Sequence, residues 1–535
     1  MSGAYDASSL LLPDVIAHHG RWRAGRAALV CGDRSVSWAQ CDADTNRIAN
    51  GLRALGLAPG ARLAVLMSNS IEMAELLLGA GKAGVSVVPL NVSVTDAAVA
   101  AMIADSGAVA VAASGEHCAR IDSIAAGVAG GAHWLRLGVG APAGRGWLDL
   151  PSWRDAQPAT PTGLRVGADD ECNIIYSSGT TGLPKGIVHT HGCRLAWAAD
   201  VGQALRYHSG AVTICSIGLY SNIMWVSLLA TALLGGTIVI LPAFSPAALF
   251  DEIERHRVTH GAFVPVQLQR LLEADRAGRD LSSLQALMCC GSPLPVAVKR
   301  AIPRALGCEL IELYGLTEGL VTTLDPEDFE RKIESVGRPI PGQQIELVRD
   351  DDRPVPPGQP GEIVGLGRLT MTGYHNRSEA TAEATWVDAQ GRSWLRTGDI
   401  GRVDDEGFLY LVDRKKDMIL SGGQNVFPAD LEAVLLQHPS VSEVAVIGIP
   451  SERWGETPLA LVVPRGAAGA AHAVATANGT DTRASTDADA EALRAWANER
   501  LGKQQRLAGL RFIESLPRNP NGKVLKRELR KAWSA

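Results

Sequence analysis

The residues that could do chemistry first gather at Tyr176, where the chain reads YSSGTTGLPKG. Glycines let backbone N–H groups turn toward an anion, hydroxyls donate to phosphate oxygens, and Lys185 supplies a positive charge. The segment is not a Walker A loop, because Gly186 rather than Ser or Thr follows Lys185. A G-x-G-x-x-G signature is missing too, since Gly365 and Gly367 lack a third glycine at position 370. The composition therefore predicts phosphate binding by a loop of another kind.

Further polar motifs follow in a fixed order. They are CGSPLP from Cys290, ELYGLTEG from Glu312, GEIVGLG from Gly361, TGY from Thr372, WLRTGD from Trp394, DRKKDMILSGGQN from Asp413 and PRNPNGK from Pro517. In this order, over residues 176–523, they resemble the motifs of the adenylate-forming superfamily, which contains acyl-CoA synthetases, peptide-synthetase adenylation domains and firefly luciferase. The chain looks most like a freestanding acyl-CoA synthetase.

The resemblance implies roles for individual residues. It implies Lys523, Thr181 and Glu318 as catalytic residues, with Glu318 also as the magnesium ligand, because a hard cation that bridges phosphates needs carboxylate oxygen. The residues that it implies for ATP binding are Ser177, Ser178, Gly179, Thr180, Thr181, Gly182, Lys185, Gly291, Ser292, Pro293, Glu312, Tyr314, Gly315, Thr317, Asp399 and Arg414. Among them, the resemblance implies Gly291, Ser292, Pro293 and Tyr314 for adenine, and Asp399 and Arg414 for the ribose. Lys523 would bridge the carboxylate and the α-phosphate, and thereby stabilise charge in the transition state.

A second set of residues is implied for coenzyme A. Ser421, Gly422 and Gly423 would line a tunnel for the pantetheine arm after a small C-terminal domain rotates about a hinge at Lys416. Asp413 stands where some members of the family have glycine, which predicts a stiffer hinge. The lysine-x-proline common in the family is replaced by Gln505, Arg506 and Leu507, and the CoA phosphate contacts at that place are not carried over.

The acyl pocket is predicted from the neighbourhood of the motifs. Its candidates are Tyr220, Asn222, Trp225, Phe263 and Val264, with Gly315 beside them. Tyr220 cannot supply the aspartate with which peptide-synthetase domains pair an α-amino group. The bulk of Tyr220 and Trp225 favours a small, branched or cyclic acid, and Asn222 could bind a hydroxyl or carbonyl group.

His189 and His191 have the spacing of a metal pair. In a strand, that spacing places both histidines on one face without a third ligand. We therefore favour a structural role for both.

The elements that must position these residues alternate along the first 165 positions. Helices are expected over residues 44–55 and 71–83, strands over 62–67 and 85–89, a connecting loop over 138–163, and a strand over 171–176. Such alternation predicts a mostly parallel α/β sheet. Residues 337–373, dense in Pro and Gly, predict a small β-rich subdomain. The expected fold is thus a large N-terminal domain of α/β subdomains plus that β-rich subdomain, followed by a small mobile α+β domain.

Length and composition limit the number of domains and the kinds of partner that the chain can have. At 535 residues the chain exceeds the ~250–300 residues of one hydrophobic core, so at least two domains are expected. We place them at 1–415 and 416–535, with a flexible insertion at about 466–490, where bulky apolar residues are lacking. The net charge of −6 gives no reason to bind nucleic acid. The nine cysteines show no metal or disulfide spacing and favour reduced thiols in the cytoplasm.

One charge-free run, residues 209–250, tests the expectation of no membrane span. Its most apolar part is split by Gly235 and Gly236 and closed by Pro242. The pieces predict a buried helix over 223–234 and a buried strand over 237–241 rather than the ~20 apolar residues of a span. The N-terminus lacks the basic region of a secretory signal.

Three functions remain to be compared. The first is an acid–CoA ligase that uses ATP, Mg²⁺ and CoA on a small carboxylic acid, with a homodimer left open. The second is a stand-alone adenylation protein that loads the thiol of a separate carrier protein. The third is a non-catalytic nucleotide-binding module, against which the presence of Lys185, Glu318, Asp399 and Lys523 argues.

Overall fold

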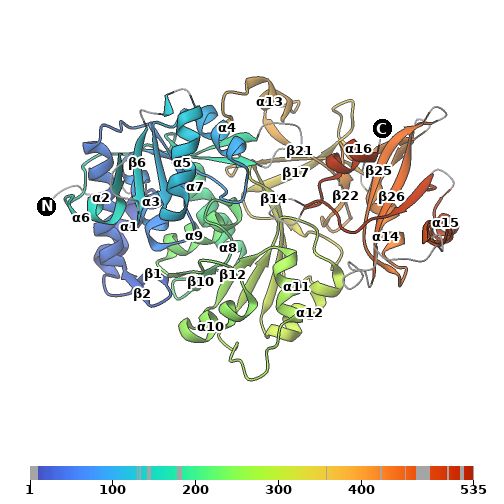
Figure 1. The fold of residues 1–535 in the computed structure, drawn as a ribbon, viewed down its shortest axis with the longest axis horizontal. Helices are drawn as coiled ribbons and strands as arrows, with labels where there is room; N and C mark the ends of the chain where they lie inside the picture. Colours follow the sequence, from blue (N-terminus) through green and yellow to red (C-terminus); the bar gives the residue numbers. More distant parts are fainter. Residues whose placement is uncertain are drawn as a thin grey trace. The chain divides into compact units, whose positions relative to one another are not determined.

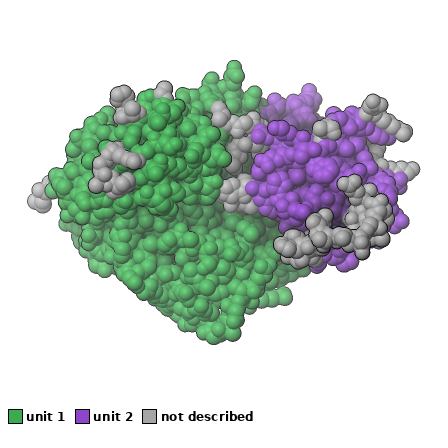
Figure 2. Space-filling model, viewed as in Figure 1, with its two compact units in different colours: residues 1–345, 365–395 green, residues 346–364, 396–535 purple. Residues whose placement is uncertain are grey.

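Two compact units make up the computed structural model (Figures 1 and 2). Unit 1 contains residues 1–345 and 365–395, and unit 2 contains residues 346–364 and 396–535. The structure describes residues 10–128, 130–131, 134–140, 146–177, 184–356, 358–421, 424–451, 454–465, 482–502, 505–518 and 523–533. Each unit is described by itself.

Unit 1 contains an eight-stranded, mostly parallel sheet. Its order is β19 (Gly373–Tyr374), β9 (Lys185–Thr190), β8 (Glu171–Ser177), β4 (Ser86–Pro89), β3 (Arg62–Leu66), β5 (Ala110–Ser114), β6 (Leu135–Val139) and β7 (Trp147–Asp149). Leu63 and Val65 of β3 belong to one hydrophobic core, and Ala64 and Leu66 belong to another. Because successive side chains of a strand point to opposite faces, both faces of this sheet are buried.

A second sheet of unit 1 has nine strands. Its order is β16 (Arg338–Pro339), β15 (Gly319–Leu324), β14 (Glu309–Leu316), β13 (Ala286–Cys289), β12 (His260–Phe263), β10 (Val212–Cys215), β11 (Thr237–Ile240), β1 (Ala27–Cys31) and β2 (Arg34–Ser37). The strands from β14 to β1 run parallel. The carboxyl ends of neighbouring parallel strands therefore meet along one edge, where α/β sheets bind ligands.

Helices of unit 1 fill the main core together with residues of both sheets (Figure 1). The helices that contribute most to it are α1 (Leu12–Trp22), α2 (Trp38–Ala54), α3 (Ile71–Lys82), α7 (His191–Ala196), the π-helical segment η2 (Trp197–Val201) and α9 (Asn222–Leu234). The others are α4 (Asp96–Ser106), α5 (Gly115–Gly127), α6 (Leu150–Asp155), α8 (Gly202–Ala204), α10 (Pro246–His256), α11 (Pro265–Glu273), α12 (Val296–Leu306) and α13 (Ser378–Glu383).

The predicted elements can now be compared with the observed ones. The buried helix and strand expected in the charge-free run are α9 and β11, and among the described residues no helix is long and apolar enough to cross a bilayer. The loop expected over 138–163 is wrong, because β7 and α6 form within it. Asp149 caps α6 by accepting from the backbone N–H of Ser152 at 3.2 Å.

A five-stranded sheet contains the three places at which the chain passes between the units. Its order is β17 (Gln343–Val348), β18 (Gly361–Gly367), β21 (Ser393–Val403) and β20 (Thr385–Val387), with β22 (Leu409–Arg414) paired to β21. These strands agree with the β-rich subdomain expected from residues 337–373.

Unit 2 also contains a sheet covered on both faces. Its order is β24 (Gln424–Val426), β23 (Ile419–Ser421), β26 (Gly455–Pro464) and β25 (Val441–Ser451), with β27 (Gly509–Phe512) beside β26. Helices α14 (Pro428–Leu435) and α15 (Thr482–Arg500) belong to one core, and α16 (Lys526–Trp533) belongs to the other. Most of the insertion expected at 466–490 lies outside the described residues, and from Thr482 the chain is helical. The domain boundary at Lys416 stays a prediction about the hinge.

All nine cysteines are free thiols. Eight of them are buried and Cys31 is partly exposed. Burial raises the pKa of every one of these thiols.

The Gly337→Ala substitution should destabilise unit 1 by at least about 3 kcal/mol. Gly337 has a φ of +86°, and an added Cβ would lie 1.7 Å from the carbonyl oxygen of Thr323 in β15. Neither the strand nor the left-handed backbone can give way cheaply. Urea unfolding, followed by tryptophan fluorescence, measures the shift of the midpoint.

Gly32→Ala is the matched control. Gly32 also has a positive φ, +57°, but an added Cβ there meets nothing within 4 Å. It should cost roughly 1 kcal/mol, the price of the backbone conformation alone. Equal shifts for the two variants would contradict the steric argument.

Candidate active site

The glycine-rich segment joins β8 to β9 in an antiparallel hairpin of unit 1. Ser177 and Lys185 are paired across it, so they stand opposite each other where the segment leaves and re-enters the sheet. Ser178, Gly179, Thr180, Thr181 and Gly182, expected to bind phosphate, lie outside the described residues. The phosphate role of Lys185 stays a prediction.

Tyr374 connects Lys185 to Glu318. The Lys185 Nζ lies 4.6 Å from the centroid of the Tyr374 ring, within the range of a cation–π interaction. The hydroxyl of Tyr374 donates to Glu318 Oε1 at 2.9 Å. Tyr374 reaches this place because β19 pairs with β9, opposite Ile187. The sequence motif TGY contained this residue without a role, and the structure places it between two predicted phosphate-side groups.

Four other candidates follow the carboxyl ends of adjacent parallel strands. Thr317 follows β14, Gly291 follows β13, Val264 follows β12, and Tyr220 follows β10. Strands in one sheet are ~4.8 Å apart, so chain segments distant in sequence share one edge. This edge gathers predicted adenine and acyl residues of unit 1 together with Thr317, while the predicted phosphate residue Lys185 lies in the other sheet.

The segment after β13 is an exposed turn. Gly291 has a φ of +96°, a left-handed conformation that favours glycine. An added Cβ would lie 3.3 Å from Ile223 Cδ1, at the start of α9, and 3.5 Å from Val264 Cγ1. Ser292 is half-buried and Pro293 exposed, while Tyr314 is half-buried and Gly315 exposed on β14. The predicted adenine segment thus borders the predicted acyl pocket.

Glu312 has a different environment from the other nucleotide candidates. Its carboxylate is buried in β14 and pairs with Lys299, which is also buried. Lys299 additionally donates to the carbonyl oxygen of Ile333 at 2.8 Å. Burial raises the pKa of the Glu312 carboxyl, and Lys299 opposes this shift. The pair joins α12 to β14, and the Glu312 carboxylate thereby forms an ion pair inside the fold.

The acyl-pocket candidates divide by exposure. Trp225, Phe263 and Val264 are buried, and the Nε1 of Trp225 donates to the carbonyl oxygen of Leu219 at 2.8 Å. Tyr220 and Asn222 are half-buried. Only the latter two offer polar side-chain atoms at a partly open position.

The two histidines of the HTH segment belong to different elements. His189 lies in β9 and His191 begins α7, so they do not share a strand face as expected. Both are buried, and burial lowers the pKa of His191 to about 4. His189 Nε2 donates to the carbonyl oxygen of Thr317 at 2.8 Å, which supports the structural role.

Unit 2 carries the predicted ribose residues. Asp399 in β21 and Arg414 in β22 are cross-strand partners, and Arg414 Nε donates to Asp399 Oδ1 at 2.9 Å. Lys523 is half-buried, and burial lowers its pKa to about 8. The charge of Arg414 also lowers this pKa and that of Asp399 raises it, so both members of the pair act electrostatically on the Lys523 ammonium.

The predicted hinge and tunnel residues follow in the same unit. Lys416 is exposed in the turn between β22 and β23. Asp413 accepts from the backbone N–H groups of Arg414 at 2.7 Å and Ala429 at 3.0 Å. Ser421 ends β23 opposite Gln424, while Gly422 and Gly423 lie outside the described residues.

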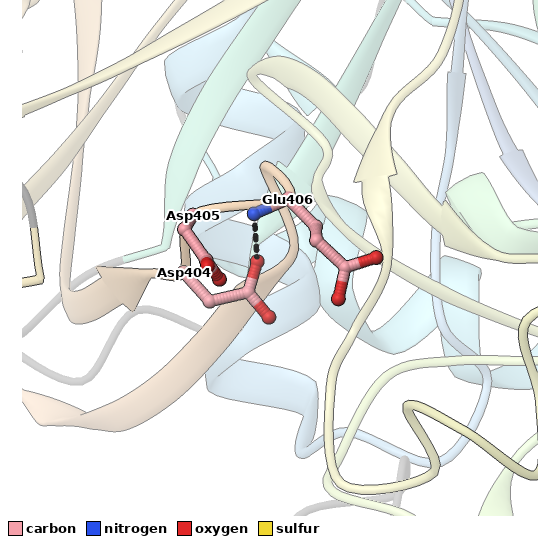
Figure 3. A group of neighbouring side chains, drawn as sticks. All are labelled: Asp404, Asp405 and Glu406. Atoms are coloured by element: carbon pink, nitrogen blue, oxygen red, sulfur yellow. Dashed lines mark hydrogen bonds between the residues drawn. The ribbon is translucent and has the colours of Figure 1, made fainter.

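Asp404, Asp405 and Glu406 form a further acidic group that the sequence did not suggest (Figure 3). Their carboxylate oxygens lie within 4.8 Å of one another. Asp404 accepts from the backbone N–H groups of Glu406 at 3.0 Å and Phe408 at 2.9 Å. These bonds close the turn between β21 and β22, which accounts for the cluster without a metal.

Comparison with known proteins identifies the family. The model described as AMP-binding enzyme matches residues 16–375, and the model described as AMP-binding enzyme C-terminal domain matches residues 430–523. A feruloyl-CoA synthase from Amycolatopsis is 36% identical over 527 residues, covering 96% of this chain and 99% of that protein. The long-chain-fatty-acid–CoA ligase FadD13 of Mycobacterium tuberculosis is 35% identical, covering 94% of each.

Solved structures agree. The o-succinylbenzoate CoA synthetase of Bacillus subtilis, in complex with its acyl-adenylate intermediate, is similar with a TM-score of 0.79 at 28% identity, and the match covers 97% of this chain and 98% of that one. The match extends over both units of the chain. The protein therefore belongs to the AMP-binding enzyme family, the adenylate-forming superfamily that its motifs resemble.

Proposed function

We propose that the protein is an ATP-dependent acid–CoA ligase, an AMP-forming acyl-CoA synthetase. One observation carries the residue roles: Asp399 and Arg414 are paired at 2.9 Å, and the charges of both act on the Lys523 ammonium. If that pair holds the ribose hydroxyls, a neighbouring cation is close to the α-phosphate of the same nucleotide. The reaction needs a positive charge at that place.

The first half-reaction joins two anions. A carboxylate oxygen of the acid attacks the α-phosphorus of ATP, the bond to the β-phosphate oxygen breaks, and pyrophosphate leaves. Lys523 stabilises the charge that develops between carboxylate and α-phosphate. Lys185 and the hydroxyls of the glycine-rich segment hold the outer phosphates.

Mg²⁺ accompanies ATP in this proposal, and Glu318 would hold it. The residue fits a hard cation: its carboxylate is half-buried, and the hydroxyl of Tyr374 fixes one of its oxygens. When bound, the ion neutralises phosphate charge.

The second half-reaction transfers the acyl group. The thiolate of CoA attacks the acyl carbon, and AMP leaves with the electron pair of its phosphate oxygen. Lys523 must vacate the site for this step, which the hinge at Lys416 would allow by moving residues 416–535 relative to 1–415. Ser421, Gly422 and Gly423 would then line the path of the pantetheine arm.

The thiol acceptor distinguishes this function from the alternative, a stand-alone adenylation protein that loads a carrier protein.

We place the reaction in the cytoplasm, where ATP and CoA are supplied. A homodimer is compatible with it and stays a prediction. The acyl part of the carboxylic acid would bind at Tyr220 and Asn222 and at the buried candidates Trp225, Phe263 and Val264.

A pyrophosphate-release assay with a panel of aromatic, branched and straight-chain acids tests the function. At least one acid should release pyrophosphate with ATP and Mg²⁺. The amount of CoA consumed should equal the amount of AMP formed. Pyrophosphate release without CoA consumption would favour the carrier-protein alternative. No release with any acid would favour a nucleotide-binding module.

The Tyr374→Phe substitution should lower kcat/KM for ATP roughly 10- to 100-fold, because a hydrogen bond to a charged group contributes ~1.5–3 kcal/mol. The ring stays under Lys185, so only the bond to Glu318 is lost. Raising the Mg²⁺ concentration should restore part of the rate. Steady-state kinetics over a Mg²⁺ series measures both effects.

Tyr410→Phe is the control for this substitution, since the hydroxyl of Tyr410 donates to a carboxylate, Asp404, at 3.1 Å in the β21–β22 turn. Its kinetics should match the wild type. A Tyr374→Phe variant with unchanged ATP kinetics would contradict a positioning role for the tyrosine.

The pH dependence follows from Lys523. With its pKa lowered to about 8, the lysine loses its proton as pH rises through about 8 instead of near its usual 10.5. Only the protonated form stabilises the transition state, so kcat/KM for adenylate formation should fall about tenfold per pH unit above that value.

Measuring the two half-reactions separately isolates this effect. Thioester formation from supplied acyl-adenylate should lack the alkaline fall that Lys523 causes. Lys523→Ala should abolish adenylate formation and largely keep thioester formation. The assigned role would be rejected if this variant lost both half-reactions equally.

A further inference from the structure

Arg194, in α7, is the most unusual charged residue of unit 1. Its side chain is fully buried, at 0% exposure. Nε donates to Asn173 Oδ1 at 2.7 Å, Nη1 to Asn222 Oδ1 at 2.8 Å and Nη2 to His189 Nδ1 at 3.2 Å. These acceptors are all neutral, and no carboxylate among the described residues forms an ion pair with Arg194. Isolated buried charges are costly, so they call for an explanation.

Two indole rings accompany the guanidinium. Its Cζ lies 5.0 Å from the ring centroid of Trp225 and 5.9 Å from that of Trp197. Trp197 begins η2, and π-helical turns inside helices are frequent at functional sites. Burial lowers the pKa of Arg194 to about 10, so the group is charged at neutral pH. The positive charge is thus retained in a partly aromatic setting.

Arg194 fixes the direction of every bond in the network, because a guanidinium can only donate. Asn173 must turn its oxygen to Arg194, which leaves its Nδ2 without a partner among the described residues. His189 must accept at Nδ1, so its proton is on Nε2, where it donates to the Thr317 carbonyl. Asn222 must likewise point its oxygen inward and its amide N–H groups away from the arginine.

The position of Asn222 makes this orientation consequential. It is the first residue of α9 and is half-buried, and among the described residues its side chain has one hydrogen bond, the one from Arg194. Its neighbour Ile223 lies beside Gly291 of the predicted adenine turn. A two-proton donor is therefore held at the boundary between the nucleotide turn and the predicted acyl pocket.

We propose that Arg194 is a specificity-determining positioning residue, which holds the Asn222 amide as a hydrogen-bond donor toward the acyl group and thereby selects acids with an oxygen acceptor on that group. This inference rests on the proposed acid–CoA ligase function and deepens it. The acceptor is a neutral carbonyl or ether oxygen or a second carboxylate. The positive charge of Arg194 strengthens the Asn222 amide as a hydrogen-bond donor toward either kind of acceptor.

Matched acids of equal shape test the selection. One pair is 4-oxopentanoate and 4-methylpentanoate, which exchange a ketone oxygen for a methyl group. The other pair is pentanedioate and 5-methylhexanoate, which exchange a carboxylate for an isopropyl group. In at least one pair, the oxygen-bearing acid should have a kcat/KM at least tenfold higher, because a site built around a hydrogen bond rejects analogues that lack it. The pair that shows the preference identifies a neutral or an anionic acceptor.

Asn222→Asp is the decisive variant. Its carboxylate can still accept from Arg194, which favours folding, but it offers the acyl group an acceptor in place of a donor. The preference for the oxygen-bearing acid should fall at least tenfold, and most for pentanedioate. Arg194→Met should bring the ratio within a pair close to one, because the amide is then free to turn. General damage to the fold would lower both acids of a pair alike and leave their ratio unchanged.

Asn50→Asp is the matched control. Asn50 Nδ2 donates to the Pro158 and Thr160 carbonyls on an exposed face of α2, and its substitution should keep the wild-type ratios. Equal turnover of both acids in each pair by the wild type, or ratios unchanged in Asn222→Asp, would overturn this inference and leave the proposed function standing. If no acid releases pyrophosphate, the proposed function fails and the inference fails with it.

Discussion

The parallel register of β10, β12, β13 and β14 is the constraint on which the rest of the site depends. Each strand ends at the same edge of the sheet, and each is followed by a segment that the chemistry needs. A chain with a net charge of −6 offers no general attraction for ATP or for a carboxylate. The positive groups must therefore be supplied one at a time: Lys185 comes from the β8–β9 hairpin of unit 1, and Arg414 and Lys523 belong to unit 2.

Much of this arrangement could be predicted from the sequence. The apolar run with paired glycines gave α9 and β11, because helix and strand lengths and glycine breaks are local properties. The family and its chemistry followed from the ordered motifs. The predicted loop over 138–163 is wrong because a proline does not always interrupt a helix: Pro151 stands in the first turn of α6, where proline is tolerated.

The contacts between motifs could not be predicted. Glu312 stands inside a motif, yet its carboxylate is paired with Lys299, which no pattern links to it. Tyr374 was visible as a letter of TGY, but its bond to Glu318 depends on β19 pairing with β9. Arg194 had no signal at all. Its three partners lie 5, 21 and 28 positions away, on β9, β8 and α9, and they meet Arg194 only after these elements pack against α7.

The buried thiols have a consequence for an enzyme that has a thiol, CoA, among its substrates. Disulfide exchange requires a thiolate, and a thiol whose pKa is raised by burial supplies almost none at neutral pH. Oxidised CoA that enters the protein therefore meets, at the eight buried cysteines, sulfur that is both enclosed and protonated. The protein's own buried thiols are therefore unreactive in disulfide exchange, and the thiol that reacts in the second half-reaction is that of the substrate.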